Sequence, residues 1–136
     1  MPNVKFFVYS LALRQDQGEP VIIAPQTNFA LDYFPSWFTF SVTYGINGFV
    51  DKNQHTTRLV CSDQSGKVIA STNEVPVVFG EAVGWETPTE ELGFVASISL
   101  QNVPIEKVGY CTSKVFIDDQ EAGEYRIYIG KRTLGE

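Results

Sequence analysis

The chain has 136 residues, of which 43% are hydrophobic and 19% are charged, and its ten basic and sixteen acidic residues give a net charge of −6. These values are typical of a globular protein and exclude a disordered chain, so we expect a single domain over residues 1–136. Nucleic acids and anionic membranes attract proteins through clustered positive charge. Because the basic residues are scattered along this chain, we expect neither kind of partner.

The N-terminal segment carries a short apolar run rich in β-branched and aromatic residues. The run lies between Lys5 and Arg14, which is too short for a membrane helix of roughly 20 residues. No A-x-A-like signal cleavage site follows it. We therefore expect a first strand over residues 4–13 and a cytoplasmic protein. In that compartment Cys61 and Cys111 would be free thiols.

Period-two alternation between turn residues continues along the rest of the chain. It predicts further strands over residues 21–24, 28–33, 37–44, 55–62, 68–72, 75–79, 94–100, 110–118 and 124–130. The segments between them carry Gly, Asp and Asn, as turn geometry requires. Short strands at close spacing predict an all-β sandwich or barrel.

Residues 34–40, FPSWFTF, raise the question of an aromatic binding platform. Side chains alternate across a strand, so one face of the predicted strand is apolar and faces the core, and the other is expected to face solvent. The core face holds Phe38, Phe40, Val42 and Tyr44, and the solvent face holds Trp37, Thr39, Ser41 and Thr43. Trp37 is the exception on the polar face, and it either covers one end of the fold, forms a subunit contact, or contacts a ligand.

The segment 80–93, GEAVGWETPTEELG, lacks strand signals. Residues 87–90 fit the start of one helical turn with a capping box, which Gly93 could end. Trp85 either anchors this acidic loop or takes part in recognition or oligomer contact. We name Trp37, Trp85, Glu90 and Glu91 as candidate residues for contact with a ligand or partner.

No combination of residues in the sequence predicts a reaction. His55 has no accompanying nucleophile motif and reads as a surface or edge residue. The run DDQEAGE, which begins at Asp118, reads as a hairpin and lacks a calcium-loop pattern, with weak calcium binding at Asp118 and Asp119 as the alternative. We expect no metal, no cofactor and no enzyme activity. Cys61 and Cys111 both fall in phase with core positions, and a redox-dependent bridge between them stays open.

Two resemblances refine the fold. The stretch LQNVPIEKVGYC, residues 100–111, resembles the corner before strand F of immunoglobulin-like domains, in which the hydroxyl of Tyr110 would tie down the corner. Cys111 would then point to the opposite face, without the antibody-type disulfide. Residues 20–130 resemble a family of short uncharacterised bacterial β-sandwich proteins, through a D-x-x-G-x-x-I hairpin at 63–69 and a D-x-x-x-x-G hairpin at 118–123.

These resemblances imply an immunoglobulin-like antiparallel β-sandwich of about seven to nine strands with at most one short helical turn. The family offers no catalytic residues to carry over. The first functional hypothesis is a non-enzymatic binding or assembly module with a protein partner or self-association. Exposed sheet edges need cover, so the segment VPVVF (75–79) or the N-terminal strand could pair across a homo-oligomer.

Three alternatives remain open. A small-ligand or carbohydrate-binding domain would use Trp37 and Trp85 within one cleft. An enzyme would need His55 within hydrogen-bond reach of a carboxylate in a pocket. A phage-related accessory protein would bind a host factor, a role that suits small acidic single-domain proteins.

Overall fold

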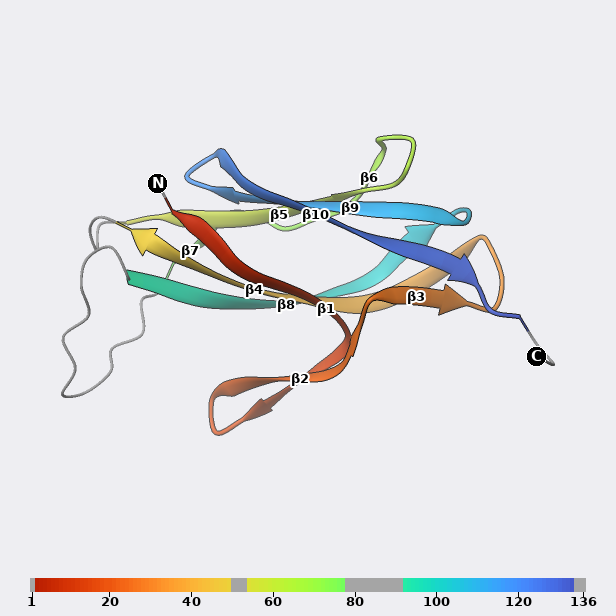
Figure 1. Ribbon diagram of the computed structural model, residues 1–136, viewed down its shortest axis with the longest axis horizontal. Helices are drawn as coiled ribbons and strands as arrows, with labels where there is room; N and C mark the ends of the chain where they lie inside the picture. The colour runs from red at the N-terminus through yellow and green to blue at the C-terminus, as the bar shows by residue number, and fades with distance from the viewer. Residues whose placement is uncertain (1, 50–53, 78–91, 134–136) are drawn as a thin grey trace.

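The computed structural model describes residues 2–49, 54–77 and 92–133, and their regular elements are ten strands. The strands are β1 (Asn3–Asp16), β2 (Glu19–Gln26), β3 (Asn28–Leu31), β4 (Ser36–Phe49), β5 (Thr56–Ser62), β6 (Val68–Ser71), β7 (Val75–Pro76), β8 (Leu92–Ile105), β9 (Gly109–Ile117) and β10 (Gln120–Lys131) (Figure 1). The predicted all-β class is confirmed, and the described residues hold ten strands, where the resemblance implied about seven to nine.

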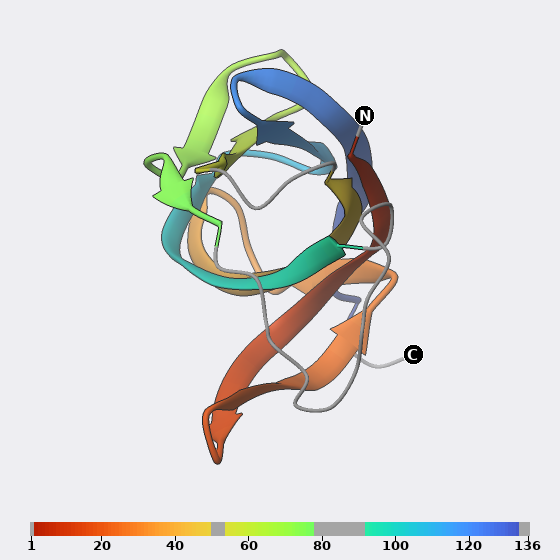
Figure 2. The ribbon, with the colours of Figure 1, turned by 90° about the vertical axis from the view of Figure 1, so that its left-hand side faces the viewer.

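The strands form two packed sheets. The four-stranded sheet has the order β2-β1-β4-β8, and the six-stranded sheet has the order β3-β10-β9-β5-β6 with β7 beside β5. The two layers lie one above the other in Figure 1 and enclose a common interior in Figure 2. All strand pairs are antiparallel except β3 with β10, which is parallel. The antiparallel prediction therefore holds for every described pair but this one.

The core lies between the two sheets and follows the predicted period. Phe40, Val42 and Tyr44 on β4 are fully buried, and each buried apolar side chain of this size stabilises the fold by about 1.5–3 kcal/mol. Phe38 is partly buried, and its ring contacts the ring of Phe29 edge-on, with 4.9 Å between the centroids. Three of the four aromatic residues in the run 34–40 therefore serve the core, because Phe34 also packs against it.

The other face of β4 corrects the sequence prediction. Ser41 and Thr43 were expected to face solvent, but both are buried, with 1% and 2% of their surface exposed. The Thr43 and Ser97 hydroxyls lie 3.3 Å apart and form a hydrogen bond, whereas the Ser41 Oγ has no hydrogen-bond partner among the described residues. Alternation assigns a side chain to a face, but it does not tell what else covers that face.

Two tyrosine hydroxyls connect the sheets through the interior. The Tyr9 Oη on β1 donates to the Ser113 Oγ on β9 over 2.8 Å, and the Tyr44 Oη lies 2.8 Å from the Thr57 Oγ1 on β5. Burial raises the pKa of both tyrosines above the ordinary range, because the phenolate would lose its hydration. Each buried hydroxyl thus finds a partner on the opposite layer.

Several predicted boundaries shift in the structure. β8 begins at Leu92 and continues through Gly93, which pairs with Asn47 of β4. Gly93 therefore lies inside a strand and does not end a helical turn, while the rest of that predicted turn lies outside the described residues. β7 covers Val75 and Pro76, while residues 78 and 79 of the predicted strand 75–79 lie outside the described residues. The N-terminal strand β1 lies between β2 and β4 within its sheet.

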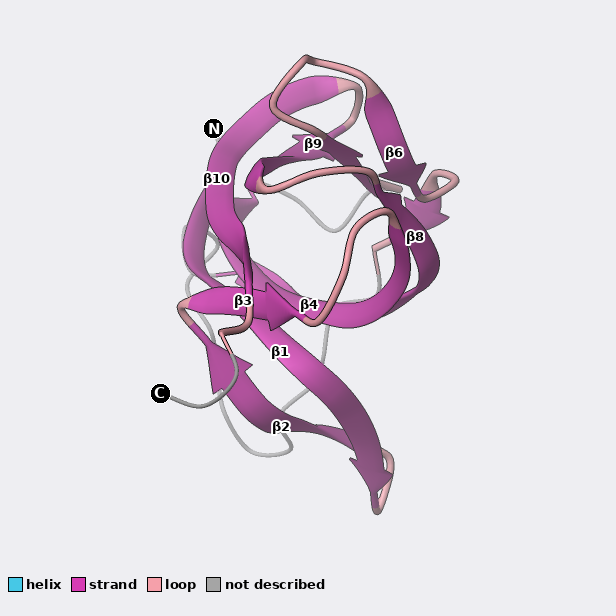
Figure 3. Ribbon diagram, turned by 90° about the vertical axis from the view of Figure 1, so that its right-hand side faces the viewer, coloured by secondary structure: helices cyan, strands magenta, loops and turns pink. Residues whose placement is uncertain are grey.

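β1 and β2 continue beyond the sandwich as a two-stranded arm, defined here as residues 10–26. Figures 2 and 3 show it projecting from the two layers. Its register pairs Ser10 with Pro25 at the root and Asp16 with Glu19 at the tip. β4 pairs with β1 only as far as Ser10, so the arm begins where β1 leaves the body of the four-stranded sheet.

Candidate functional site

Two large aromatic side chains are exposed at one end of the sandwich, where β3 of one sheet leads into β4 of the other. This connection, residues 32–35, lies at the right-hand end in Figure 1. Tyr33 is 67% exposed and Trp37 is 71% exposed, while Phe34 between them packs against the core. We call Tyr33, Trp37 and the neighbouring Pro104 the aromatic end.

Strand pairing fixes the backbone on which Trp37 is displayed. Trp37 lies opposite Pro104 across the β4–β8 pair. The connection before it is held by the ion pair of Asp32 with Arg132, whose closest atoms are 3.7 Å apart, and by the Arg132 N–H, which donates to the Leu31 carbonyl over 2.7 Å. A ring carried on paired backbone loses little conformational entropy on binding, so this surface suits recognition.

The other predicted contact residues are not placed. Trp85, Glu90 and Glu91 all lie outside the described residues. The expectation that Trp37 and Trp85 share one cleft therefore stays a prediction. Of the four named candidates, the structure describes Trp37, and it shows that ring in solvent rather than beneath other side chains. Tyr33 was missed, although its place before an aromatic and a proline in a turn was a usable signal.

His55 has a carboxylate partner that the sequence did not indicate. Its Nδ1 lies 2.6 Å from the Asp118 Oδ2, and the second carboxylate oxygen of Asp118 accepts the Thr56 N–H over 2.9 Å. The His55 side chain is only 15% exposed, and its ring centroid is 4.8 Å from that of Phe49. His55 directly precedes β5 and is partly buried, and its carboxylate partner, which the sequence did not indicate, lies 63 positions away.

Asp118 belongs to the predicted DDQEAGE hairpin, which the structure confirms between β9 and β10. Both turn residues, Asp118 and Asp119, have positive φ angles of 49° and 65°, as a two-residue type I′ turn requires. Asp119 lies 3.8 Å from Arg58. A hydrogen bond with Asp119 raises the pKa of Glu74. The described residues contain no cluster of three or more side chains suited to a metal ion.

The two cysteines face the core, as predicted, and are free thiols. Cys61 pairs with Ser113 across β5 and β9, and its Sγ lies 3.2 Å from the Ser113 Oγ. Cys111 precedes Ser113 by two residues, so its thiol lies diagonally across from Cys61 on the same face. A hydrogen bond from Cys111 lowers the pKa of Cys61, and the same contact together with burial raises that of Cys111.

Tyr110 does not form the predicted tyrosine corner. It is 38% exposed, its hydroxyl makes no hydrogen bond to a described residue, and the guanidinium of Arg126 lies 4.3 Å from its ring centroid. The corner is held instead by Gln64, whose side-chain oxygen accepts the Tyr110 N–H over 3.0 Å. Cys111 points to the opposite, buried face, as the sequence predicted.

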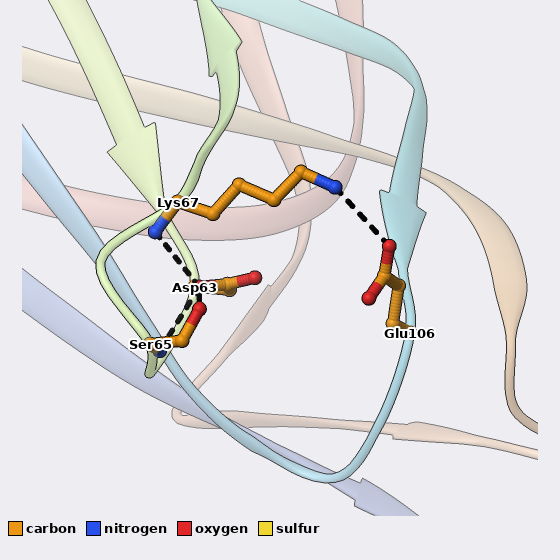
Figure 4. A network of polar contacts seen from close by, with 4 residues as sticks. All are labelled: Asp63, Ser65, Lys67 and Glu106. Carbon is orange, nitrogen blue, oxygen red and sulfur yellow. Dashed lines mark hydrogen bonds and ion pairs between the residues drawn. The ribbon is translucent and has the colours of Figure 1, made fainter.

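The β5–β6 turn beside this corner is held by one carboxylate (Figure 4). The Asp63 Oδ1 accepts the Ser65 hydroxyl over 2.6 Å, the Ser65 N–H over 2.9 Å and the Lys67 N–H over 3.0 Å. These bonds, led by the Ser65 hydroxyl, lower the pKa of Asp63. The Lys67 Nζ extends to Glu106 over 3.2 Å, which ties the turn to the segment after β8.

Comparison with known proteins finds similarity of structure only. No protein-family model and no curated protein matches the chain. The chain aligns over 95% of its length with 30% of an alkylpurine DNA glycosylase, AlkC, from Pseudomonas fluorescens, bound to DNA containing an abasic site analog, at 4% identity and a TM-score of 0.51.

Two further structures align with nearly the whole chain. An immunoglobulin-like protein from Pseudomonas aeruginosa aligns over 96% of its length with 95% of this chain, at 12% identity and a TM-score of 0.47. A β-glucuronidase from Bifidobacterium dentium aligns over 18% of its length with 97% of this chain, at 10% identity and a TM-score of 0.45.

The similarities concern the fold alone. The chain spans less than a third of the length of the glycosylase and of the glucuronidase, so their activities belong to much larger proteins. The fold of this chain is an all-β sandwich of two packed sheets. Over the part of the chain that the structure describes, no helix has the length and apolar character needed to cross a lipid bilayer.

Proposed function

We propose that the chain is a non-enzymatic binding or assembly module that contacts a protein partner through the aromatic end. The observation that carries this proposal is the exposure of Trp37, at 71%, on a strand of fixed geometry. A large aromatic ring in water gains free energy when a partner covers it, and Trp and Tyr are frequent among the residues that dominate interface energies. Tyr33, at 67% exposure, adds a second such ring on the adjacent connection.

The charge distribution supports a protein partner over a nucleic acid or an anionic membrane. The chain carries a net charge of −6. Arg58, Lys67, Lys114 and Arg132 each have an atom between 3.2 and 3.8 Å from a carboxylate. Cations already paired within the chain contribute less to phosphate neutralisation. The rim of the aromatic end includes one such pair, Asp32 with Arg132, which suits the polar border of a protein interface.

We further propose that the chain belongs to a family of short bacterial β-sandwich proteins, that it is cytoplasmic and that it has no enzyme activity. These three expectations come from the sequence. No specific observation favours the carbohydrate or phage-related alternatives, since the first depends on Trp85 sharing a cleft with Trp37.

The test is affinity capture from the native host, followed by binding measurements with the purified partner. Four baits are compared: the wild type, Trp37→Ala, Tyr33→Ala and the control Val68→Ala, which alters a 55% exposed residue on β6. We expect Trp37→Ala to weaken binding at least tenfold, about the loss seen at an interface hot spot, and Val68→Ala to bind as the wild type does. Wild-type binding by Trp37→Ala would refute the role of the aromatic end.

A further inference from the structure

The arm presents aliphatic side chains on both of its faces. Directly paired residues of an antiparallel hairpin share a face, so Leu13 and Ile22 lie on one side and Ala12 and Ile23 on the other. Leu11 remains 44% exposed on the first side, and Ile23 remains 38% exposed on the second. A lone two-stranded hairpin is at best marginally stable in water. Part of each aliphatic face of the arm is therefore exposed to solvent, and no described residue covers it.

The arm is also separate from the hydrophobic core. The core includes Tyr9 and then Phe29, and no residue of the arm between them belongs to it. Pro20 and Pro25 both lie in β2, the edge strand of this sheet. Because proline lacks an N–H, it blunts a sheet edge against the addition of another strand. The side-chain faces of the arm, rather than its edge, are therefore the surface available for a contact.

A groove of about 570 Å³ lies at the root of the arm, where the two sheets meet. Its apolar lining includes Phe7, Tyr9, Pro25 and Tyr125. The rings of Phe7 and Tyr125 stack with their centroids 4.3 Å apart, which joins β1 of one sheet to β10 of the other. The groove is a mostly apolar recess next to a mostly apolar projection of the same chain.

The charges at the tip of the arm and in the groove at its root are complementary. At the tip, Asp16 and Glu19 lie directly opposite each other, and like charges in this position repel. At the root, Arg126 lines the groove and forms no ion pair with a described residue, its guanidinium stacking on the ring of Tyr110 instead. Arg14 lies near the tip as well, so the tip carries two negative charges and one positive charge. A cation from outside the chain would relieve the repulsion at the tip.

We infer that this chain forms a homodimer by reciprocal arm exchange, in which the arm of each copy lies in the groove at the root of the other arm. A two-fold axis between antiparallel arms brings each tip to the opposite root, which places the partner's Asp16 and the partner's Glu19 beside Arg126. The surface differs from the aromatic end, so this inference does not depend on the proposed function.

The first test measures self-association by sedimentation velocity over a range of protein concentrations. We expect a wild-type dimer. Leu11 and Ile23 lie on opposite faces of the arm, so Leu11→Glu or Ile23→Glu, whichever changes the face in contact, should weaken the dissociation constant by about tenfold or more, because a carboxylate would enter an apolar contact. Val68→Glu, a matched exposed aliphatic on β6, and Trp37→Ala should leave the dimer unchanged. A wild-type chain that stays monomeric, or arm variants no weaker than Val68→Glu, would overturn the inference.

A charge exchange between two chains gives the sharper test and leaves the apolar surfaces intact. Arg126→Glu places like charges at both contacts of its own homodimer, and so does the double variant Asp16→Lys with Glu19→Lys. Each protein alone should associate more weakly than the wild type, while an equal mixture should form a heterodimer in which opposite charges meet at both ends. Circular dichroism checks that both proteins are folded. A mixture that associates no better than its separate components would overturn the inference.

Discussion

At the scale of single residues, the buried hydroxyls contribute the most specific contacts between the two sheets. The Tyr9 Oη donates to the Ser113 Oγ, which also contacts the Cys61 thiol. We expect Tyr9→Phe and Ser113→Ala each to lower the free energy of unfolding by about 1–2 kcal/mol, because each leaves a buried polar group with fewer partners. Urea titrations of both single variants and the double variant give the coupling between the residues.

The double-mutant cycle should show a coupling of about 0.5–1.5 kcal/mol, since the two groups share one hydrogen bond. Tyr33→Phe, which removes an exposed hydroxyl, serves as the control and should change stability little. Additive losses in the double variant would mean that the two hydroxyls act independently.

The buried tyrosines also predict how stability depends on alkaline pH. Burial raises the pKa of Tyr9 and of Tyr44 in the folded protein, while the unfolded chain ionises near pH 10. Below that pH both states hold their protons and the contribution is fully present. Above it the unfolded state loses protons first, so the free energy of unfolding falls with rising pH, by up to about 1.4 kcal/mol per pH unit for each tyrosine.

The measurement is the slope of unfolding free energy against pH above pH 10. Replacing both residues, Tyr9→Phe with Tyr44→Phe, should flatten this slope, even though the double variant is less stable at neutral pH. Tyr33→Phe should keep the wild-type slope. An unchanged slope in the double variant would show that other groups control alkaline unfolding.

The residues that the sequence placed correctly are those governed by alternation. Phe40, Cys61 and Cys111 face the core because their phase within a strand decides their side. The contact of His55 with Asp118 was not predicted, because it joins the start of β5 to a distant hairpin and no local pattern encodes that pairing.

At the scale of elements, the β9–β10 hairpin combines the geometry of its turn with hydrogen bonds between Asp118 and the start of β5, which we call the clasp. Asp118 holds both His55 and the Thr56 N–H, whereas Asp119 has a positive φ and a 3.8 Å contact with Arg58 that is mostly exposed. We expect Asp118→Ala to lower the unfolding free energy by about 1–3 kcal/mol, from the lost hydrogen bonds and the left-handed backbone. Asp119→Gly should be neutral or stabilise the fold by up to about 1 kcal/mol, because glycine favours this turn.

Thermal unfolding of the two variants at matched pH and ionic strength compares the clasp with the turn. The adjacent positions share the same turn and a positive φ, so each variant is compared with the other. Equal losses in both variants would mean that the turn alone, and not the contact with β5, stabilises this hairpin.

The elements could be read from the sequence more reliably than their pairing. Every predicted strand corresponds to an observed one, because each is a run with period two between turn residues. The parallel pairing of β3 with β10 and the extension of β1 and β2 into an arm were not predicted, since both depend on partners far away in the chain. Within the candidate site, Trp37 was identified because it interrupts the polar residues on one face of the predicted strand. Tyr33 lies in the connection before β4, where no alternation of side chains indicates which residues are exposed.

At the scale of the whole molecule, the surfaces for recognition and self-association lie apart. The aromatic end occupies the side where β3 leads into β4, whereas the β9–β10 hairpin and the start of β5, which the contact of His55 with Asp118 joins, lie at the opposite end in Figure 1. The arm lies between these two ends in Figure 1 and projects from the two layers in Figure 2. A dimer joined through the arms would therefore leave both aromatic ends accessible, so one assembly could present two copies of the recognition surface.

This separation predicts that the arm can be shortened without unfolding the sandwich. Ala12 and Ile23 pair directly, so residues 13–22 can be replaced by the two-residue turn Asn-Gly, which suits a hairpin. Because no core residue lies between Tyr9 and Phe29, we expect the melting temperature of the monomer to change by no more than about 4–8 °C, the shift produced by roughly 1 kcal/mol in a small domain. Sedimentation of the same protein should show a monomer at concentrations where the wild type is dimeric. A shortened chain that loses its β circular dichroism signal would place the arm within the cooperative fold, and one that still dimerises as tightly as the wild type would place the interface elsewhere.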